Sequence, residues 1–233
     1  MRFISITAVA ALPLLVAACS SAPSAGTSKP TGAAASSVTA NPDAGLTTGA
    51  QLKALLVPAA RFPSGFALDP TGSVNSGDTY QSPSSAAGAP DCTRLDATSW
   101  EALADVGSVS FAENDYIDKV TSEQYAQEID VFRGTSAQGA MAGLRKLAST
   151  CPSFHDSQTS STVTVKLSKG PALGDDALTF ALGSAAWQGG ITLEAVRVGT
   201  AVVTVLYSAS SGTGTSQATD LATAVTKNLK SKG

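Results

Sequence analysis

The sequence is poor in charge and has no basic cluster. Asp, Glu, Lys and Arg make up 14% of its 233 residues, the net charge is −3, and no basic run exceeds two residues. Nucleic-acid binding needs clustered Lys and Arg to neutralise phosphates, so we expect no nucleic-acid partner. The 43% hydrophobic content and the length are sufficient for the core of one domain.

The sequence also lacks the residues of several common active sites. It has one histidine, His155, and no G-x-S-x-G turn, whereas a Ser-His-Asp hydrolase on an α/β scaffold uses both. A zinc site needs further Cys or His ligands at short spacing. We therefore expect no catalytic residues, no metal site and no cofactor, and we interpret His155 as a solvated loop residue.

No apolar run is long enough to span a bilayer. The longest, Phe3 to Val16, follows the positive start Met1-Arg2 and has the length of a signal-peptide core. It ends in Val16-Ala17-Ala18-Cys19, which resembles the lipobox of bacterial lipoproteins, where the cysteine is diacylglycerated and becomes the mature N-terminus. The alternative is an ordinary secretory signal with a chance cysteine at its end.

The lipobox divides the chain into three parts. We expect a lipoprotein signal peptide at 1–18, a lipidated Cys19 with a flexible Ser/Ala/Thr/Pro tether at 19–45, and an extracytoplasmic domain at 46–233. The tether has almost no large apolar residue, so burial cannot offset its entropy of folding. Two acyl chains anchor stably, so the predicted location is the extracytoplasmic side of the cell membrane, with Cys19 as the membrane attachment.

Few cysteines remain for the domain. Lipidation of Cys19 leaves Cys92 and Cys151, an even pair in a domain that folds outside the cytoplasm. We expect them to form a disulfide, which stabilises by roughly 4 kcal/mol for a loop of this length. A metal or catalytic thiol is the alternative.

Hydrophobic periodicity indicates an α+β domain, a single antiparallel sheet with helices packed on one face and one disulfide. A Thr48–Gln51 capping box begins a short helix, Ser136 begins a longer one that ends near Cys151, and a last helix covers 218–229. Gly139 and Gly143 suggest that the middle helix packs closely on the sheet. We predict helical turns at 93–104. The predicted strands are 66–68, 106–112, 125–133, 162–167, 178–182, 191–198 and 201–207.

Two groups of acidic residues invite a catalytic or calcium interpretation. Glu113, Asp115 and Asp118 do not follow the spacing of an EF-hand loop, and a polar turn between strands explains them. Asp175 and Asp176 fit a turn that leads into a strand.

Two larger side chains are the candidate ligand-binding residues. Arg197 shares strand parity with Ile191, Leu193 and Ala195, so it either lies on an apolar face, where it must find a partner or line a cavity, or faces water at the strand end. Trp187 lies in a Gly-rich junction, where it either walls a pocket or packs on the core.

The order of elements and several short motifs resemble the extracellular sensor-like domain of mycobacterial Ser/Thr kinases of the PknH type and of many actinobacterial lipoproteins. The matching pieces, between Leu46 and Leu229, are Leu52-x-x-Leu55-Leu56, Cys92-x-x-Leu95, Val131-Phe132 with Ala137 and Ala140, Cys151, Leu173-Gly174-Asp175-Asp176-Ala177 and Val196-Arg197-Val198-Gly199. The resemblance implies a ligand-binding or sensing module with a cleft and no catalytic residues. The sequence departs from the family pattern in having one cysteine pair rather than two.

These observations predict a lipid-anchored, extracytoplasmic, non-catalytic module that binds a ligand or partner: a small molecule, a lipid or an envelope protein. The leading alternative is an envelope hydrolase that uses carboxylates such as Glu113, Asp115, Asp175 and Asp176. A structural spacer lipoprotein without a ligand is the third interpretation.

Overall fold

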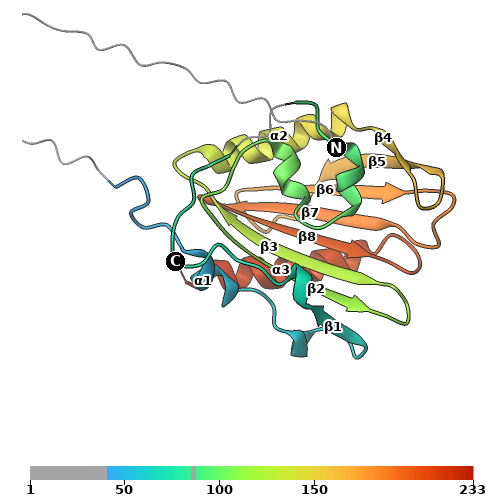
Figure 1. The fold of residues 1–233 in the computed structure, drawn as a ribbon, viewed down its shortest axis with the longest axis horizontal. Coiled ribbons are helices and arrows are strands. Elements are labelled where there is room, and N and C mark those ends of the chain that lie inside the picture. Colours follow the sequence, from blue (N-terminus) through green and yellow to red (C-terminus); the bar gives the residue numbers. More distant parts are fainter. Residues whose placement is uncertain (1–40, 85–87, 233) are drawn as a thin grey trace, which may run out of the picture. The chain divides into compact units, whose positions relative to one another are not determined.

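The computed structural model describes residues 41–84 and 88–232, and an eight-stranded antiparallel sheet dominates this part of the chain (Figure 1). Its strands are β1 (Phe66–Asp69), β2 (Ser110–Asp118), β3 (Gln124–Val131), β4 (Ser153–Asp156), β5 (Ser161–Lys169), β6 (Asp176–Gly183), β7 (Ile191–Val198) and β8 (Ala201–Ser208). Their spatial order is β1-β2-β3-β8-β7-β6-β5-β4. The predicted signal peptide and Cys19 lie outside the described residues.

Strands that follow one another in the sequence pair as antiparallel neighbours, except that β3 pairs with β8 rather than with β4. β7 and β8 pair through the predicted tight turn, in which Gly199 has a φ of 58°, a conformation that glycine adopts without steric cost. β8 then lies against β3 rather than at an edge. As a result, β3, β8 and β7 form the centre of the sheet, and β7 and β8 are buried along most of their length.

Helices cover both faces of the sheet. They are α1 (Gly49–Lys53), α2 (Ser136–Thr150) and α3 (Thr215–Lys230), with 3₁₀ turns η1 (Ala59–Arg61), η2 (Pro70–Gly72), η3 (Cys92–Asp96) and η4 (Trp100–Ala104). The α+β class with a single antiparallel sheet is confirmed. The placement of the helices differs from the prediction, because α2 packs on one face while α1 and α3 pack on the other. The reason is that the central strands are apolar on both faces, as a strand covered on both sides must be.

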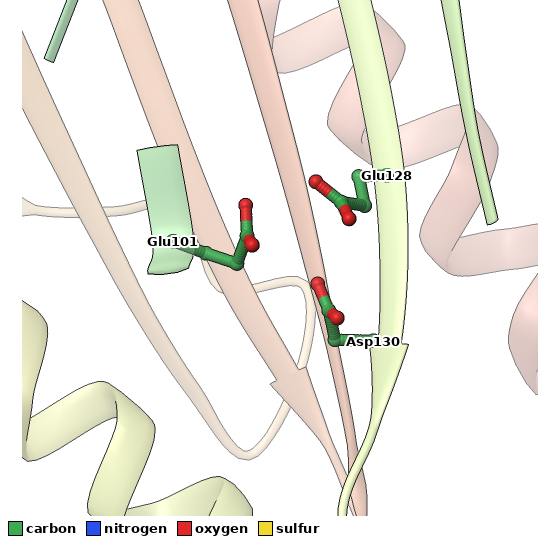
Figure 2. Close-up of side chains that lie close together, drawn as sticks. All are labelled: Glu101, Glu128 and Asp130. Atoms are coloured by element: carbon green, nitrogen blue, oxygen red, sulfur yellow. The ribbon is translucent and has the colours of Figure 1, made fainter. Parts of the chain in front are cut away.

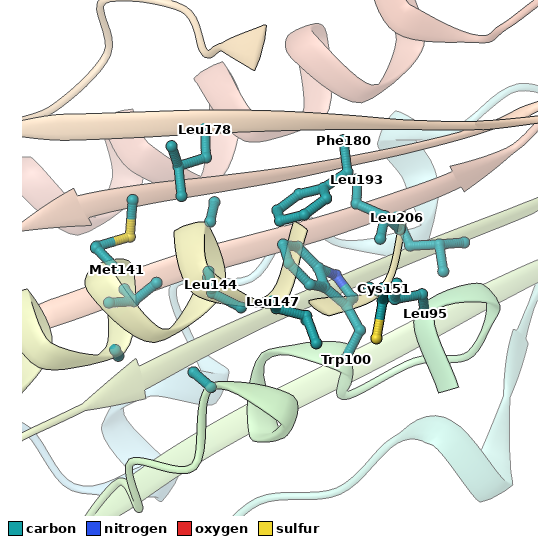
Figure 3. Close-up of a cluster of buried hydrophobic side chains, with 14 of the residues drawn as sticks. Leu95, Trp100, Met141, Leu144, Leu147, Cys151, Leu178, Phe180, Leu193 and Leu206 are labelled. Carbon is teal, nitrogen blue, oxygen red and sulfur yellow. The ribbon is translucent and has the colours of Figure 1, made fainter. Parts of the chain in front are cut away.

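The core under α2 is centred on Trp100 and Phe180, whose rings meet edge to face with centroids 5.5 Å apart. Figure 3 shows leucines of α2, β6, β7 and β8 around this pair. Because Trp100 belongs to η4, this core holds η4 against the sheet. The core on the opposite face contains the buried side chains of α1 and α3 and an aromatic group that includes Tyr125 and Tyr207, with ring centroids 4.4 Å apart.

The disulfide also positions the segment that carries η3 and η4. Cys92 of η3 is bonded to Cys151, the C-cap residue of α2, with Cα atoms 5.6 Å apart, so the predicted pairing is confirmed. The close approach predicted at the glycines of α2 also occurs, but it is made to η4 and not to the sheet. A Cβ atom built on Gly143 clashes with the backbone carbonyl of Ala104 in η4, whereas one on Gly139 has ordinary contact with Val106. Glycine at 143 therefore allows η4 to lie directly on the helix.

Two further findings concern the ends and edges of the fold. The capping box is confirmed, since the Thr48 hydroxyl accepts from the Gln51 amide and the Gln51 side chain accepts from the Thr48 amide. His155 is exposed but belongs to the edge strand β4, so its placement in a loop was wrong. Within residues 41–84 and 88–232, no helix is both long and apolar enough to cross a membrane.

Candidate functional site: an acidic cleft

Strand β2 is longer than predicted, and its second half is acidic. It continues through Glu113 and Asp115 to Asp118, so the first two carboxylates lie within a strand, and their assignment to a turn was wrong. The alternation of a strand explains how this is possible. Ala112 and Tyr116 are buried in the core beneath α1 and α3, so Glu113 and Asp115 point to the opposite face. Only Asp118, whose carboxylate accepts the Val120 amide at 2.8 Å, takes part in a turn.

Strand β3 brings two more carboxylates to the same face. Glu128 is the register partner of Glu113, and Asp130 follows two residues later on the same side of the strand. The intervening Ile129 belongs to the core on the other face. The sequence predicts β3 as a strand, but it does not mark the acidic positions of β3 as a site.

The third element of the site is η4, which crosses over this end of the sheet. Its Glu101 follows Trp100, and burial of the tryptophan directs the glutamate toward β3. Figure 2 shows the carboxylates of Glu101, Glu128 and Asp130 pointing toward one another, and one oxygen from each lies within 4.8 Å of the others. We call these three residues the acidic triad.

Each carboxylate of this site has one buried oxygen without a hydrogen-bond donor. Glu128 is 5% exposed and Asp130 is 3% exposed. Seven buried side-chain oxygens have no hydrogen-bond partner in the described part of the chain, and five of them belong to carboxylates of η4, β2 and β3: Glu101 Oε2, Glu113 Oε1, Asp115 Oδ1, Glu128 Oε2 and Asp130 Oδ2. Most buried polar groups in folded proteins are hydrogen-bonded, so the three orphaned oxygens of Glu101, Glu128 and Asp130, which lie together, indicate a site that is completed from outside.

Burial and mutual repulsion disfavour the charged forms. Burial, followed by repulsion from Glu101, raises the pKa of Glu128 and of Asp130 well above the usual range. Burial also raises the pKa of Glu101 and Glu113, and it raises the pKa of Asp115 to about 7. A positive charge that enters the site would relieve both effects.

The triad is accessible through a cleft of about 310 Å³. Within the described residues, the cleft is lined by Phe111 of β2, Phe132 after β3, Asp105 after η4 and one basic residue, Arg94, among others. Arg94 is exposed and lies near Glu101, but no ion pair joins it to a carboxylate in residues 41–84 and 88–232. The cleft therefore has an acidic floor that the protein's own arginine does not neutralise.

The backbone that carries Glu101 is held in an unusual conformation. Ser99 and Asp105, the residues that flank η4, both have left-handed backbones, with φ values of 53° and 58°. For residues other than glycine this conformation is uncommon and costs about 1–3 kcal/mol. Ser99 also donates a hydrogen bond from its hydroxyl to Glu113 Oε2 at 3.1 Å. This hydrogen bond ties the start of η4 to β2.

The structure does not bring the two candidate ligand-binding residues together. Trp187 precedes β7 and donates its indole N–H to Asp156 Oδ2 at 2.9 Å, and it packs against the core under α2. Arg197 lies near the other end of β7 and pairs with Asp175 at 3.1 Å. Neither residue lines the acidic cleft. A ligand-binding role for either one stays a prediction.

The four carboxylates considered for a hydrolase are also separated. Asp176 pairs with Arg145 of α2, and Asp175 accepts from Arg197 and from the Gly199 amide. Both precede or begin β6, which lies four strand spacings from β2. At about 4.8 Å per spacing, this is on the order of 19 Å from Glu113 and Asp115. These four residues do not form one site.

Comparison with known proteins defines the fold. No protein-family model matches the chain, and no curated protein is significantly similar to it in sequence. The structure is similar to the crystal structure of the extracellular domain of PknH from Mycobacterium tuberculosis, with a TM-score of 0.55 and 16% identity. The match covers 79% of this chain and 97% of that domain. The resemblance found in the sequence is thus confirmed at the level of the fold.

Proposed function

We propose that this protein is a lipid-anchored, extracytoplasmic binding module that takes up a positively charged ligand in the acidic cleft and catalyses no reaction. The observation that carries the proposal is that three carboxylates lining the cleft, Glu101, Glu128 and Asp130, each have a buried oxygen without a hydrogen-bond donor. Buried charge is costly unless it is paired, so a cationic ligand gains more at this cleft than at an exposed acidic patch.

Three features support a location outside the cytoplasm. The Cys92–Cys151 disulfide belongs to an oxidising compartment. The fold is similar to that of an extracellular domain of a kinase. The sequence that ends in Cys19 has the lipobox pattern described above, followed by a polar segment suited to a tether. Together they favour a sensor-like module held at the membrane surface by its N-terminus.

One observation favours an enzyme instead. Asp115 lies near Glu113 on β2 with a pKa raised to about 7, which is the range of a general acid. An acid-base pair of Asp115 and Glu113 would hydrolyse a bound substrate, and Asp115→Asn would abolish turnover. We favour binding because the unpartnered oxygens extend over three elements, η4, β2 and β3, rather than flanking one position.

The test is thermal unfolding of residues 20–233, which retain the whole domain and lack Cys19. The compounds are CaCl₂, MgCl₂, MnCl₂, spermidine and a lysine pentapeptide, with glucose and N-acetylglucosamine as neutral controls. A ligand at 100 times its Kd adds about 2.7 kcal/mol, which raises the Tm by several degrees in a domain of this size. We expect at least one cationic compound to do so.

Two variants make the assignment specific. Glu128→Gln removes one buried charge with little change in shape, and it should abolish the shift. Asp220→Asn changes an exposed carboxylate of α3, which packs on the opposite face of the sheet, and it should keep the shift. If no cation shifts the Tm, or if the shift persists in Glu128→Gln, cation binding in the cleft is refuted.

A further inference from the structure

We propose that the acidic triad is a binding site for a divalent metal ion of the calcium class, with Glu101, Glu128 and Asp130 as its protein ligands. This inference rests on the proposed function and names the ligand of the same cleft. It goes against the expectation from the sequence that the chain has no metal site, because that expectation considered His, Cys and EF-hand spacing and not carboxylates brought together by the fold.

The charge at the site calls for more than a monovalent cation. Three carboxylates converge there, and two of them are at least 95% buried. Arg94 is the one basic residue in the described lining of the cleft, and it forms no ion pair with the triad. Coordination requires the carboxylates to release the protons that burial favours, and a single ammonium group would then leave two of three negative charges uncompensated. A divalent ion leaves one, with Arg94 nearby.

The spacing of the oxygens suits direct coordination. Calcium binds oxygen at about 2.3–2.6 Å, so two ligands on opposite sides of the ion are separated by about 4.6–5.2 Å. The ligand oxygens of the triad all lie within 4.8 Å of one another, so one ion can contact all three without large movement of the backbone. Glu128 and Asp130 differ in side-chain length, which lets positions two residues apart on β3 reach a common point.

The chemistry of the ligands selects the class of metal. All three are carboxylates, which are hard ligands preferred by Ca²⁺, Mg²⁺ and Mn²⁺, whereas zinc and copper favour nitrogen and sulfur. His155 lies on β4 at the far edge of the sheet, and Cys92 and Cys151 are bonded to each other. Calcium takes six to eight oxygens in flexible geometry, and the cleft of about 310 Å³ has room for the water ligands that would complete its shell.

Metal binding would join two parts of the domain. Glu101 belongs to η4, and Glu128 and Asp130 belong to β3, so one ion cross-links the segment that carries η4 to the centre of the sheet. Because η4 lies against Gly143 of α2, the ion would also stabilise the contact between that segment and the helix.

The experiment uses residues 20–233 freed of metal with a chelator. Terbium, a luminescent substitute for calcium, is titrated with excitation of tryptophan, since Trp100 is adjacent to Glu101. We expect saturable luminescence that CaCl₂ displaces, and calorimetry with CaCl₂ should give one site per chain. Glu101→Gln, Glu128→Gln and Asp130→Asn should each weaken binding by about tenfold or more, because even groups that only hydrogen-bond to a metal's ligands change the metal affinity by about 10–100-fold.

The controls separate this inference from the proposed function. Asp220→Asn, on α3 at the opposite face of the sheet, should bind the metals like the unaltered chain, and far-ultraviolet circular dichroism in chelator should show every variant folded. If no metal binds while spermidine or the lysine peptide still raises the Tm through Glu128, the metal site is refuted and the cationic cleft stands. If neither metals nor organic cations bind, both fail. Metal binding that survives in Glu128→Gln and Asp130→Asn also overturns the inference.

Discussion

Glu113 of β2 and Glu128 of β3 face each other directly across the antiparallel sheet, and both side chains are buried. Like charges at directly opposed positions destabilise a sheet, and burial increases the cost. Violations of such rules concentrate at functional sites, where the cost is offset when a ligand binds. This pair is therefore the structural reason for placing the ligand site at this end of the sheet.

The first prediction concerns pH. Burial raises the pKa of Asp115 to about 7, against about 3.9 in an unfolded chain. The folded state then holds its proton more tightly, so the contribution of Asp115 to the free energy of unfolding of the metal-free protein falls as pH rises from about 4 to about 7 and then levels off. The full effect of this group is on the order of 4 kcal/mol.

Urea unfolding across that pH range, in chelator, measures this dependence. Asp115→Asn should make the slope over this range less negative than in the unaltered protein. An equal slope in Asp115→Asn would show that Asp115 is not protonated in the folded state.

The second prediction compares two glycines of α2. Gly143→Ala places a Cβ against the Ala104 carbonyl, so we expect the free energy of unfolding to fall by about 1–3 kcal/mol despite the better helix propensity of alanine. Gly139→Ala meets only ordinary contact and should raise it by up to about 1 kcal/mol. Chemical denaturation of both variants is the measurement. Equal effects of the same sign would mean that η4 does not lie on the helix at Gly143.

The third prediction concerns the disulfide. The bridge closes a separation of 59 residues, and its removal by the paired substitution Cys92→Ala and Cys151→Ala should lower the free energy of unfolding by about 4 kcal/mol. It should also weaken cation binding, because the bridge holds the segment that carries Glu101. In the unaltered protein, a thiol reagent should find Cys92 and Cys151 unreactive until reduction. Two reactive thiols in the native chain would contradict the bridge.

The fourth prediction concerns the membrane. Cys19 should be diacylated in cells that process lipoproteins, and the mature protein should partition into the detergent phase. Cys19→Ala should move it to the aqueous phase. Ser21→Ala is the matched control, because it changes a small residue close to Cys19 without removing the lipidation site or the disulfide. Detergent partitioning that is unchanged in Cys19→Ala would refute the lipid anchor.

Much of the fold could be predicted from the sequence because local signals were strong. The Thr48 capping box, the 3.6-residue period of α2 and α3, and the two-residue spacing at Gly199-Thr200 each act over a few residues. The distribution of helices over both faces could not be predicted in this way. It depends on β8 lying between β3 and β7, and this pairing of distant segments leaves no local mark.

The acidic site escaped prediction for a similar reason. Glu113 and Asp115 look like turn residues because strands seldom carry buried carboxylates. The alternation of Ala112 and Tyr116 with these acids, and of Ile129 with Glu128 and Asp130, was the signal that a strand continues. Glu101 belongs to a third, separate segment, and only the tertiary fold brings it to β3.

The most direct test of the account is a crystal structure of residues 20–233 grown with terbium, with its anomalous scattering mapped. The account predicts one strong peak between Glu101, Glu128 and Asp130, with carboxylate oxygens at roughly 2.3–2.6 Å as expected for a calcium-class ion. An absence of any peak at the triad, with the Arg94 guanidinium inserted among the carboxylates instead, would contradict it.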